Sequence, residues 1–165
     1  MSYFYQHPVE PVEKPGERPI LRRRRSLTIE AVVSQQVRGF LRERAALKAQ
    51  GRTLGPALLF FGCRHPEQDF IYAEELREQS DAGIVELHVA FSRHDGKKTY
   101  VQDLLAQQAD RVRALIDQGA IVYVCGDGGR MEPDVKRALV GMYDEAFVAK
   151  LAADNRYVLD VWASS

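Results

Sequence analysis

The sequence predicts an α/β fold in which a doubly wound parallel sheet carries helices on its faces. From about residue 29 onward, short apolar runs alternate with longer segments of helical periodicity. The apolar runs lack polar alternation, which is typical of strands buried on both faces. Because strands separated by helices pair in parallel, the pattern indicates one sheet with helices packed on it.

The composition fits a single domain with a substantial core. The chain has 165 residues, of which 45% are hydrophobic and 28% charged. Its longest apolar run, 57–63, is far shorter than the roughly 20 residues of a membrane-spanning helix. The N-terminus lacks a secretory-signal pattern, and two cysteines, Cys63 and Cys125, make no disulfide framework. We therefore expect a cytoplasmic protein with free thiols.

Residues 1–28 form a separate segment rich in proline and arginine. Four of the seven prolines and the run Arg22 to Arg25 lie here, and no apolar periodicity is present. The composition predicts an extended or disordered tail before a folded domain at 29–165. Such an arginine run can bind nucleic acid or acidic lipid, but it is more often solvated, and we expect no nucleic-acid partner.

The first half of the folded segment predicts two helices and two strands. Apolar residues at helical spacing predict a helix over 30–49, and a continuous apolar run predicts a buried strand over 57–61. Pro66 favours the first turn of a helix over 66–79. A glycine then leads into a second strand over 84–91.

The second half repeats this alternation. A Thr-x-x-Gln capping box precedes a helix over 100–117, whose apolar residues lie three and four apart. A strand over 120–125 and a helix over 132–151 follow. The segment 157–162 is expected to be the last strand.

The turns after three of the strands predict a ligand-binding edge. In open parallel sheets, ligands bind beyond the carboxyl ends of the strands. The turns 62–65, 92–96 and 126–130 contain glycine and lead toward helix N-termini, which favour anions. Five cations gather at the same edge: Arg64, Arg93, Lys97, Lys98 and Arg130. A phosphorylated ligand is the simplest partner, although polar loops of this kind also occur without any ligand.

Four segments occur in one order along the chain: FFGCRHPEQDFIYAEEL, HVAFSRHDGKKTYVQ, IVYVCGDGGRMEPDV and RYVLDVW. With them, the chain from about Arg38 onward resembles the C-terminal NADP-binding module of the diflavin reductases. That family includes NADPH–cytochrome P-450 reductase and bacterial P-450–reductase fusions. The resemblance implies a Rossmann-like fold of the ferredoxin-reductase type and the cofactor NADPH.

The resemblance implies a pocket for the adenosine 2′-phosphate at Ser92, Arg93, Lys98 and Tyr100. A guanidinium and an ammonium both engage a phosphate dianion, and the hydroxyls complete the shell. Without the resemblance, the lysine fits a solvated turn and Tyr100 a packed helix-start residue.

The resemblance also implies a hydride-transfer site at Cys125, Asp160 and Trp162. Cys125 would lie beside the nicotinamide, Asp160 would help to position the hydride donor, and Trp162 would cover the flavin ring. From the residues alone, Cys125 also fits a buried thiol and Trp162 an anchor for the C-terminus. Further cofactor contacts implied by the resemblance are Arg64, Asp127, Met131 and Asp134, although Met131 equally fits the core. No metal site is expected, because the cysteines have no partner at ligand spacing.

Two features depart from the family pattern. Family members carry a strand and a G-P-G-T-G loop just before the tripeptide that stands here as Arg38-Gly39-Phe40, and glycine lets that loop approach the pyrophosphate. This chain has no glycine between Gly16 and Gly39, so the loop is missing and the β-branched run either forms a substitute strand or extends the first helix. Residues 1–37 are also too short to hold FAD, which must come from another domain or chain.

The sequence therefore predicts the NADPH-binding module of a flavin-dependent electron-transfer reductase of the NADPH–hemoprotein reductase type. We expect a fragment that does not turn over alone and that presents nicotinamide to FAD elsewhere, with electrons passing to FMN and a haem protein. Two alternatives stay open: a non-catalytic nucleotide-binding or interaction protein, and a nucleic-acid binder acting through its basic tail.

Overall fold

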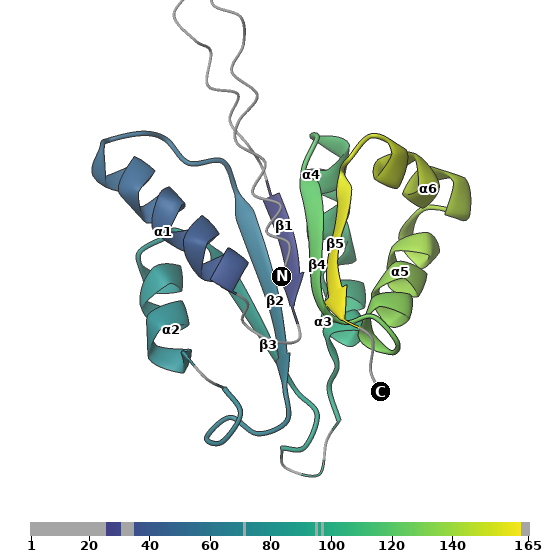
Figure 1. Ribbon diagram of the computed structural model, residues 1–165, viewed down its shortest axis with the longest axis horizontal. Coiled ribbons are helices and arrows are strands. Elements are labelled where there is room, and N and C mark those ends of the chain that lie inside the picture. The colour runs from purple at the N-terminus through teal and green to yellow at the C-terminus, as the bar shows by residue number, and fades with distance from the viewer. Residues whose placement is uncertain (1–25, 31–34, 71, 95, 97, 163–165) are drawn as a thin grey trace, which may run out of the picture.

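The structure, a computed structural model, describes residues 26–30, 35–70, 72–94, 96 and 98–162. Five parallel strands form one sheet in the order β3-β2-β1-β4-β5 (Figure 1). The strands are β1 (Ser26–Glu30), β2 (Ala57–Cys63), β3 (Glu86–Phe91), β4 (Ile121–Asp127) and β5 (Tyr157–Trp162). The helices are α1 (Gln35–Ala49), α2 (Ala73–Asp81), α3 (Val101–Gln107), α4 (Ala109–Asp117), α5 (Met131–Met142) and α6 (Glu145–Ala153). The predicted α/β class with parallel strands is confirmed.

β1 lies in the middle of the sheet, at the place where the sequence left open a strand or a longer first helix. It pairs with β2 on one side and β4 on the other, starting with Ser26 beside Ala57 and Ile121. β-branched residues favour a strand, and the slot between β2 and β4 presents backbone groups that a strand satisfies. The helix predicted over 30–49 is therefore too long, since α1 begins at Gln35.

The sheet thus begins inside the 1–28 segment that the sequence assigns to the tail. The arginine run lies in residues 1–25, outside the described residues, and so does the connection 31–34 between β1 and α1. The absence of a glycine-rich pyrophosphate loop is therefore a property of the sequence, which contains no glycine from 17 to 38.

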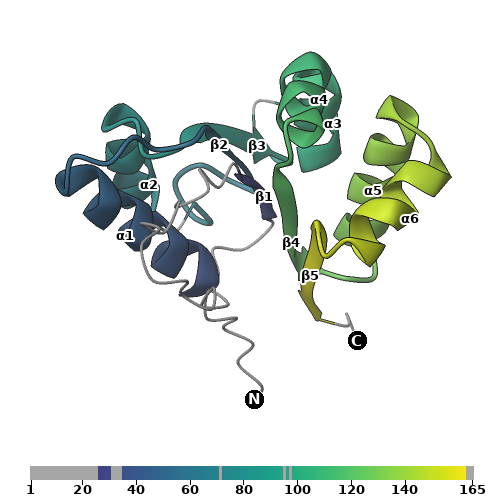
Figure 2. The ribbon, with the colours of Figure 1, turned by 90° about the horizontal axis from the view of Figure 1, so that it is seen from above.

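Side chains of β2 alternate between two cores, one on each face of the sheet. Leu58 and Phe60 belong to the core that also contains residues of α3, α4, α5 and α6, whereas Leu59 and Phe61 belong to the core that contains residues of α1 and α2 (Figure 2). All four side chains are almost completely buried. Because both faces are covered at this strand, its sequence is an uninterrupted apolar run.

Two helices that the sequence predicts as continuous are each divided. The helix expected over 100–117 breaks at Gln108 into α3 and α4, and the one expected over 132–151 breaks before Asp144 into α5 and α6. The Asp144 carboxylate starts α6 by accepting a hydrogen bond from the Phe147 amide at 2.7 Å. Apolar spacing does not reveal these breaks, because both halves of each pair bury their apolar residues in the same core.

The helix expected over 66–79 begins only at Ala73. A turn precedes it, and the Asp69 carboxylate accepts a hydrogen bond from the His65 amide across that turn at 3.0 Å. The proline that suggested a helix start therefore begins this turn instead. Among the described helices, none combines the length and the apolar character needed to span a membrane.

Candidate functional site

The carboxyl ends of the strands lie at one edge of the sheet, the lower edge in Figure 1. At this edge the chain after β3 is fixed to the chain after β2 by two backbone hydrogen bonds. The Ser92 amide donates to the Cys63 carbonyl and the Arg93 amide to the Arg64 carbonyl, each at 2.9 Å. Arg64 and Arg93 are both exposed, so two cationic side chains extend from adjacent positions of the edge.

The four residues predicted to bind the 2′-phosphate lie on the segment 92–100, between β3 and α3. The Thr99 amide donates to the Phe91 carbonyl at 3.1 Å and returns the end of the segment to β3. Lys98 and Tyr100 are exposed, Tyr100 to 44%, and Ser92 is half-buried. The structure thus places these candidates close together on one short segment, whose two ends are joined by the Thr99–Phe91 hydrogen bond.

Two carboxylates at this edge accept hydrogen bonds from backbone amides that precede helices. Asp127 accepts hydrogen bonds from the Gly129 amide at 2.7 Å and the Arg130 amide at 3.2 Å, just before α5. Asp103 accepts from the Tyr100 amide at 2.8 Å at the start of α3, one residue later than the expected Thr-x-x-Gln box. Acidic side chains also lie in the first turns of both helices, Asp103 in α3 and Glu132 and Asp134 in α5, so a phosphate at this edge depends on arginine and lysine side chains.

The residues predicted to serve hydride transfer lie on one face of the adjacent strands β4 and β5. Cys125 is the register partner of Asp160, and Asp127 is the register partner of Trp162. Tyr157 packs in the core under α3 to α6. Because side chains alternate along a strand, Asp160 and Trp162 point to the opposite face.

Exposure differs sharply among these residues. Cys125 is 3% exposed, whereas Trp162 is 47% exposed and Asp160 is also open to solvent. Trp162 is therefore nearly half open to solvent, on the edge strand β5. An aromatic side chain with this exposure can stack on a planar group brought by another domain or chain.

Gly128 fixes the end of β5 against the turn after β4. Its amide donates to the Trp162 carbonyl at 2.9 Å. A Cβ atom at position 128 would lie 3.0 Å from Cγ2 of Val161 and 3.2 Å from the Trp162 carbonyl oxygen. The glycine is thus required by a close approach of two backbones, a reason that the sequence alone did not reveal.

Asp134 and Met131 lie in the first turn of α5. Met131 packs against the core, which fits the structural role that the sequence left open for it. Asp134 accepts a hydrogen bond from Nε2 of Gln102 at 3.2 Å and forms an ion pair with Arg137 at 2.7 Å. Sequence reasoning missed this role of Gln102, because its only visible signal was the capping-box pattern.

Cys63 lies at the end of β2 and packs beside the core under α1 and α2. Burial, with a smaller contribution from Asp69, raises the pKa of its thiol to about 11. The thiol is therefore protonated at neutral pH and is a weak nucleophile. A structural role for Cys63 is consistent with this environment. Within the part of the chain that the structure describes, no three His, Cys, Asp or Glu side chains are grouped to hold a metal ion.

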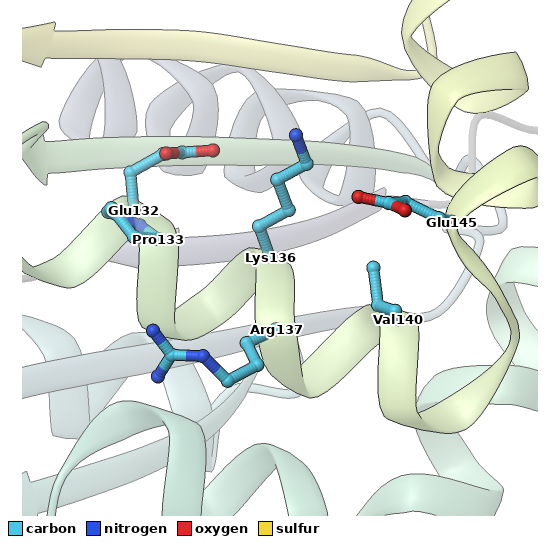
Figure 3. A pocket seen from close by; sticks show the side chains of 6 residues that line it. All are labelled: Glu132, Pro133, Lys136, Arg137, Val140 and Glu145. Carbon is cyan, nitrogen blue, oxygen red and sulfur yellow. The ribbon is translucent and has the colours of Figure 1, made fainter.

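A hollow of about 420 Å³ lies elsewhere, along α5 and the start of α6 (Figure 3). It is lined by Glu132, Pro133, Lys136, Arg137, Val140 and Glu145. In Figure 3, Glu132 and Lys136 project on one side of α5 and Arg137 on the other. Charges of both signs line it, and it contains none of the predicted site residues.

Comparisons with known proteins agree with the resemblance found in the sequence. The profile of the oxidoreductase NAD-binding domain family matches residues 36–137. The chain is 46% identical over 137 residues to bifunctional cytochrome P450/NADPH–P450 reductase 1 of Bacillus subtilis, an alignment that covers 76% of this chain and 13% of that protein. It is 41% identical over 136 residues to human NADPH–cytochrome P450 reductase, covering 76% of this chain and 20% of that protein. The chain therefore spans a fifth or less of these relatives, and it belongs to the oxidoreductase NAD-binding domain family.

Proposed function

We propose that this chain is the NADPH-binding module of a flavin-dependent electron-transfer reductase, with a doubly wound fold of the ferredoxin-reductase type. One observation carries the proposal. The residues expected for hydride transfer, Cys125, Asp160 and Trp162, come from two different strands and yet share one face. The printed names of the relatives, which are NADPH–P450 reductases, support the same assignment.

The adenosine half of the cofactor would bind along the segment 92–100. Arg93 and Lys98 are exposed there and supply a guanidinium and an ammonium, which suit a phosphate dianion. Arg64 is tied beside Arg93 through the backbone and adds a third cation. These cations gain most from a ligand that carries the 2′-phosphate, so we expect NADPH to bind more tightly than NADH.

The nicotinamide half would lie over the face that carries Cys125. When bound, NADPH supplies a hydride, and a flavin on another domain or chain accepts it. The exposed Asp160 can hold the ring by a polar contact, and Cys125, which is 3% exposed, lies beside it on the same face. The exposed Trp162 ring would contact the flavin on the other domain or chain. A haem protein would be the final acceptor of the electrons.

A titration with 2′,5′-ADP and 5′-AMP tests the adenosine half by calorimetry. We expect 2′,5′-ADP to bind at least about tenfold more tightly than 5′-AMP, since charge-assisted bonds to the added phosphate carry the difference. Arg93→Ala should remove that preference. Arg52→Ala is the matched control, because Arg52 is exposed but follows α1 at the other end of the strands. Equal binding of the two nucleotides, or binding of neither, would reject the proposal.

A second candidate is a nucleotide-binding protein that moves no hydride. The sequence between β1 and α1 favours it, because a pyrophosphate loop without glycine cannot bring its backbone as close to the ligand. Adding the FAD-containing part of a related reductase separates the two candidates. NADPH oxidation that requires both components supports the reductase module, and tight 2′,5′-ADP binding without oxidation supports the second candidate.

A further inference from the structure

A second hollow, of about 350 Å³, lies where β2 and β3 begin. Because the strands are parallel, these amino ends lie at the edge of the sheet opposite the proposed cofactor site, the upper edge in Figure 1. Apolar side chains form part of its walls, among them Leu54, Pro56 and Val85. Small-molecule pockets span roughly 300–1,000 Å³, so the volume suits a small ligand. We call this site the amino-edge hollow.

Arg44 of α1 lines the amino-edge hollow and is buried, with 6% of its surface exposed. Its Nε donates to the Ile84 carbonyl at 2.8 Å and its Nη2 to the Gly55 carbonyl at 2.7 Å. Burial lowers the pKa of the guanidinium, but an arginine side chain stays charged at neutral pH. No carboxylate among the described residues forms an ion pair with it. The hollow therefore contains a buried positive charge that its protein neighbours do not compensate.

Two more cations lie at the same place. Lys48, one helical turn after Arg44, donates from Nζ to the Ala82 carbonyl, and this nitrogen is 3.2 Å from where a Cβ of Gly83 would lie. Arg111 of α4 lines the hollow from another side, and half of its side chain is exposed. Positive charge thus approaches the turn between α2 and β3 from two helices.

The nearby carboxylates do not cancel this charge. Glu86 also lines the hollow, but its two oxygens contact Arg111 at 3.5 Å and His88 at 3.1 Å. Asp81 is exposed at the end of α2 and is not part of the lining. Since Arg44 and Arg111 face one glutamate, the described lining carries a net positive charge.

A purely structural role explains Lys48 better than Arg44. α2 has no basic residue in its own last turn, and Lys48 stabilises the negative end of that helix. Arg44 instead holds the carbonyls of Gly55 and Ile84, which are neutral acceptors that an uncharged amide side chain could also satisfy. A buried charge costs free energy unless an opposite charge compensates it. The charge of Arg44, as distinct from its hydrogen bonds, therefore has no structural use in this arrangement.

We propose that the amino-edge hollow binds the phosphate group of a small molecule, or free phosphate, against Arg44 and Arg111. Nη1 of Arg44 has no hydrogen-bond partner among the described residues and can donate to a phosphate oxygen. Arg111 can move from its exposed pair with Glu86 and close over the anion, because such a surface pair is weak. The site goes beyond the proposed function and does not depend on it.

A titration of the isotope-labelled chain with inorganic phosphate tests the proposal. We expect saturable shifts of the backbone amide signals of Gly83 and Ile84, with a dissociation constant in the millimolar range. Phenyl phosphate, titrated in parallel, distinguishes the two sources of the phosphate group. Tighter binding than that of inorganic phosphate supports an ester whose apolar part lies along Leu54 and Pro56, and equal binding supports free phosphate.

A matched pair of variants on α4 tests the location. Arg111→Glu adds a second carboxylate to the hollow and should weaken phosphate binding at least about fivefold. Arg113→Glu makes the same change of charge two residues later, on nearly the opposite side of the helix, where Arg113 lies over the Tyr143 ring. Its effect should be less than about twofold, because exposed charges are screened.

Arg44→Lys tests the buried charge itself. The lysine keeps the charge but loses the planar fork that holds two carbonyls and an anion together, so phosphate should bind at least about tenfold more weakly. Thermal unfolding shows whether this variant is folded. If it is not, the Arg111→Glu and Arg113→Glu pair decides the question alone.

Saturable shifts at Gly83 and Ile84 that Arg111→Glu weakens and Arg113→Glu spares support the site. Shifts confined to Arg93 and Tyr100 would overturn the proposal, because the phosphate would then bind only at the cofactor edge. Equal weakening by the two α4 variants, or no shifts in a folded chain, would overturn it as well. The shifts at the hollow should persist in Arg93→Ala, so this site can stand where the proposed cofactor function fails, and the reverse.

Discussion

Cys125 and Asp160 are register partners on the parallel strands β4 and β5. Their side chains therefore leave the sheet on the same face, although 34 residues separate them in the sequence. Cys125 is buried and Asp160 is exposed, so a buried thiol and an exposed carboxylate lie side by side on this face. This arrangement is what we expect where a ring is laid on a sheet and held from one side.

Replacing Cys125 tests that area without disturbing the phosphate-binding segment. Cys125→Ala should lower the rate of NADPH-dependent flavin reduction at least about tenfold when an FAD-containing partner is supplied, because the nicotinamide loses a positioning contact. Binding of 2′,5′-ADP should stay within about twofold, since 92–100 follows a different strand. Rapid-mixing absorbance and calorimetry measure the two effects. Cys63→Ala is the control, and an equal loss of rate in that variant would contradict the assignment.

Replacing Trp162 tests whether its ring covers a flavin or anchors the last strand. The side chain is 47% exposed, so Trp162→Ala should change the free energy of unfolding by less than about 1 kcal/mol. Tyr157→Ala on the same strand removes a buried ring and should cost about 3 kcal/mol or more. Urea unfolding followed by circular dichroism measures both. A loss above about 2 kcal/mol in Trp162→Ala would identify the ring as an anchor.

Gly128→Ala should destabilise the chain by about 1–3 kcal/mol, because the added methyl group would overlap Val161 and the backbone of Trp162. Gly141→Ala is a matched control in α5, where no atom lies within 4 Å of the added Cβ and alanine favours the helix. Its effect should have the opposite sign, up to about 1 kcal/mol. Two variants of equal stability in urea would refute the close approach at Gly128.

The raised pKa of Cys63 predicts a loss of stability in alkali. Burial lifts the pKa from 9.0 to about 11, so the folded state holds its proton more tightly than the unfolded state. The resulting contribution is complete below pH 9 and is lost as the pH rises from 9 through 11. Cys63→Ala should therefore show a shallower fall in stability between pH 9 and 10. Parallel pH profiles of the two proteins would contradict this environment for the thiol.

The apolar strands were predictable because burial on both faces leaves a continuous signal in the sequence. Leu58 to Phe61 give such a run, and the structure confirms a strand there. The central strand was harder, because the five residues of β1 are short and partly polar and gain their strand partners only from β2 and β4. Its placement depends on pairing across the chain, which local pattern does not contain.

The candidate site was also predictable from the sequence only in part. Ser92, Arg93, Lys98 and Tyr100 could be grouped from the sequence because they lie within nine residues. The pairing of Cys125 with Asp160 and the hydrogen bond from Gln102 to Asp134 join residues more than thirty positions apart, so they follow from sheet register and helix packing. The helix N-termini were expected to be available to anions, but whether a carboxylate such as Asp103 already accepts a hydrogen bond there depends on local geometry.

The most direct test of the account is a titration of the isotope-labelled chain with NADP⁺, followed by the backbone amide signals. Bound NADP⁺ should shift the signals of Arg93 and Tyr100 and, in the same titration, those of Cys125 and Asp160. The fragment 2′,5′-ADP should shift only the first pair, because it lacks the nicotinamide half. Shifts confined to the hollow along α5, or no shifts in a folded chain, would contradict the assignment of this edge to the cofactor.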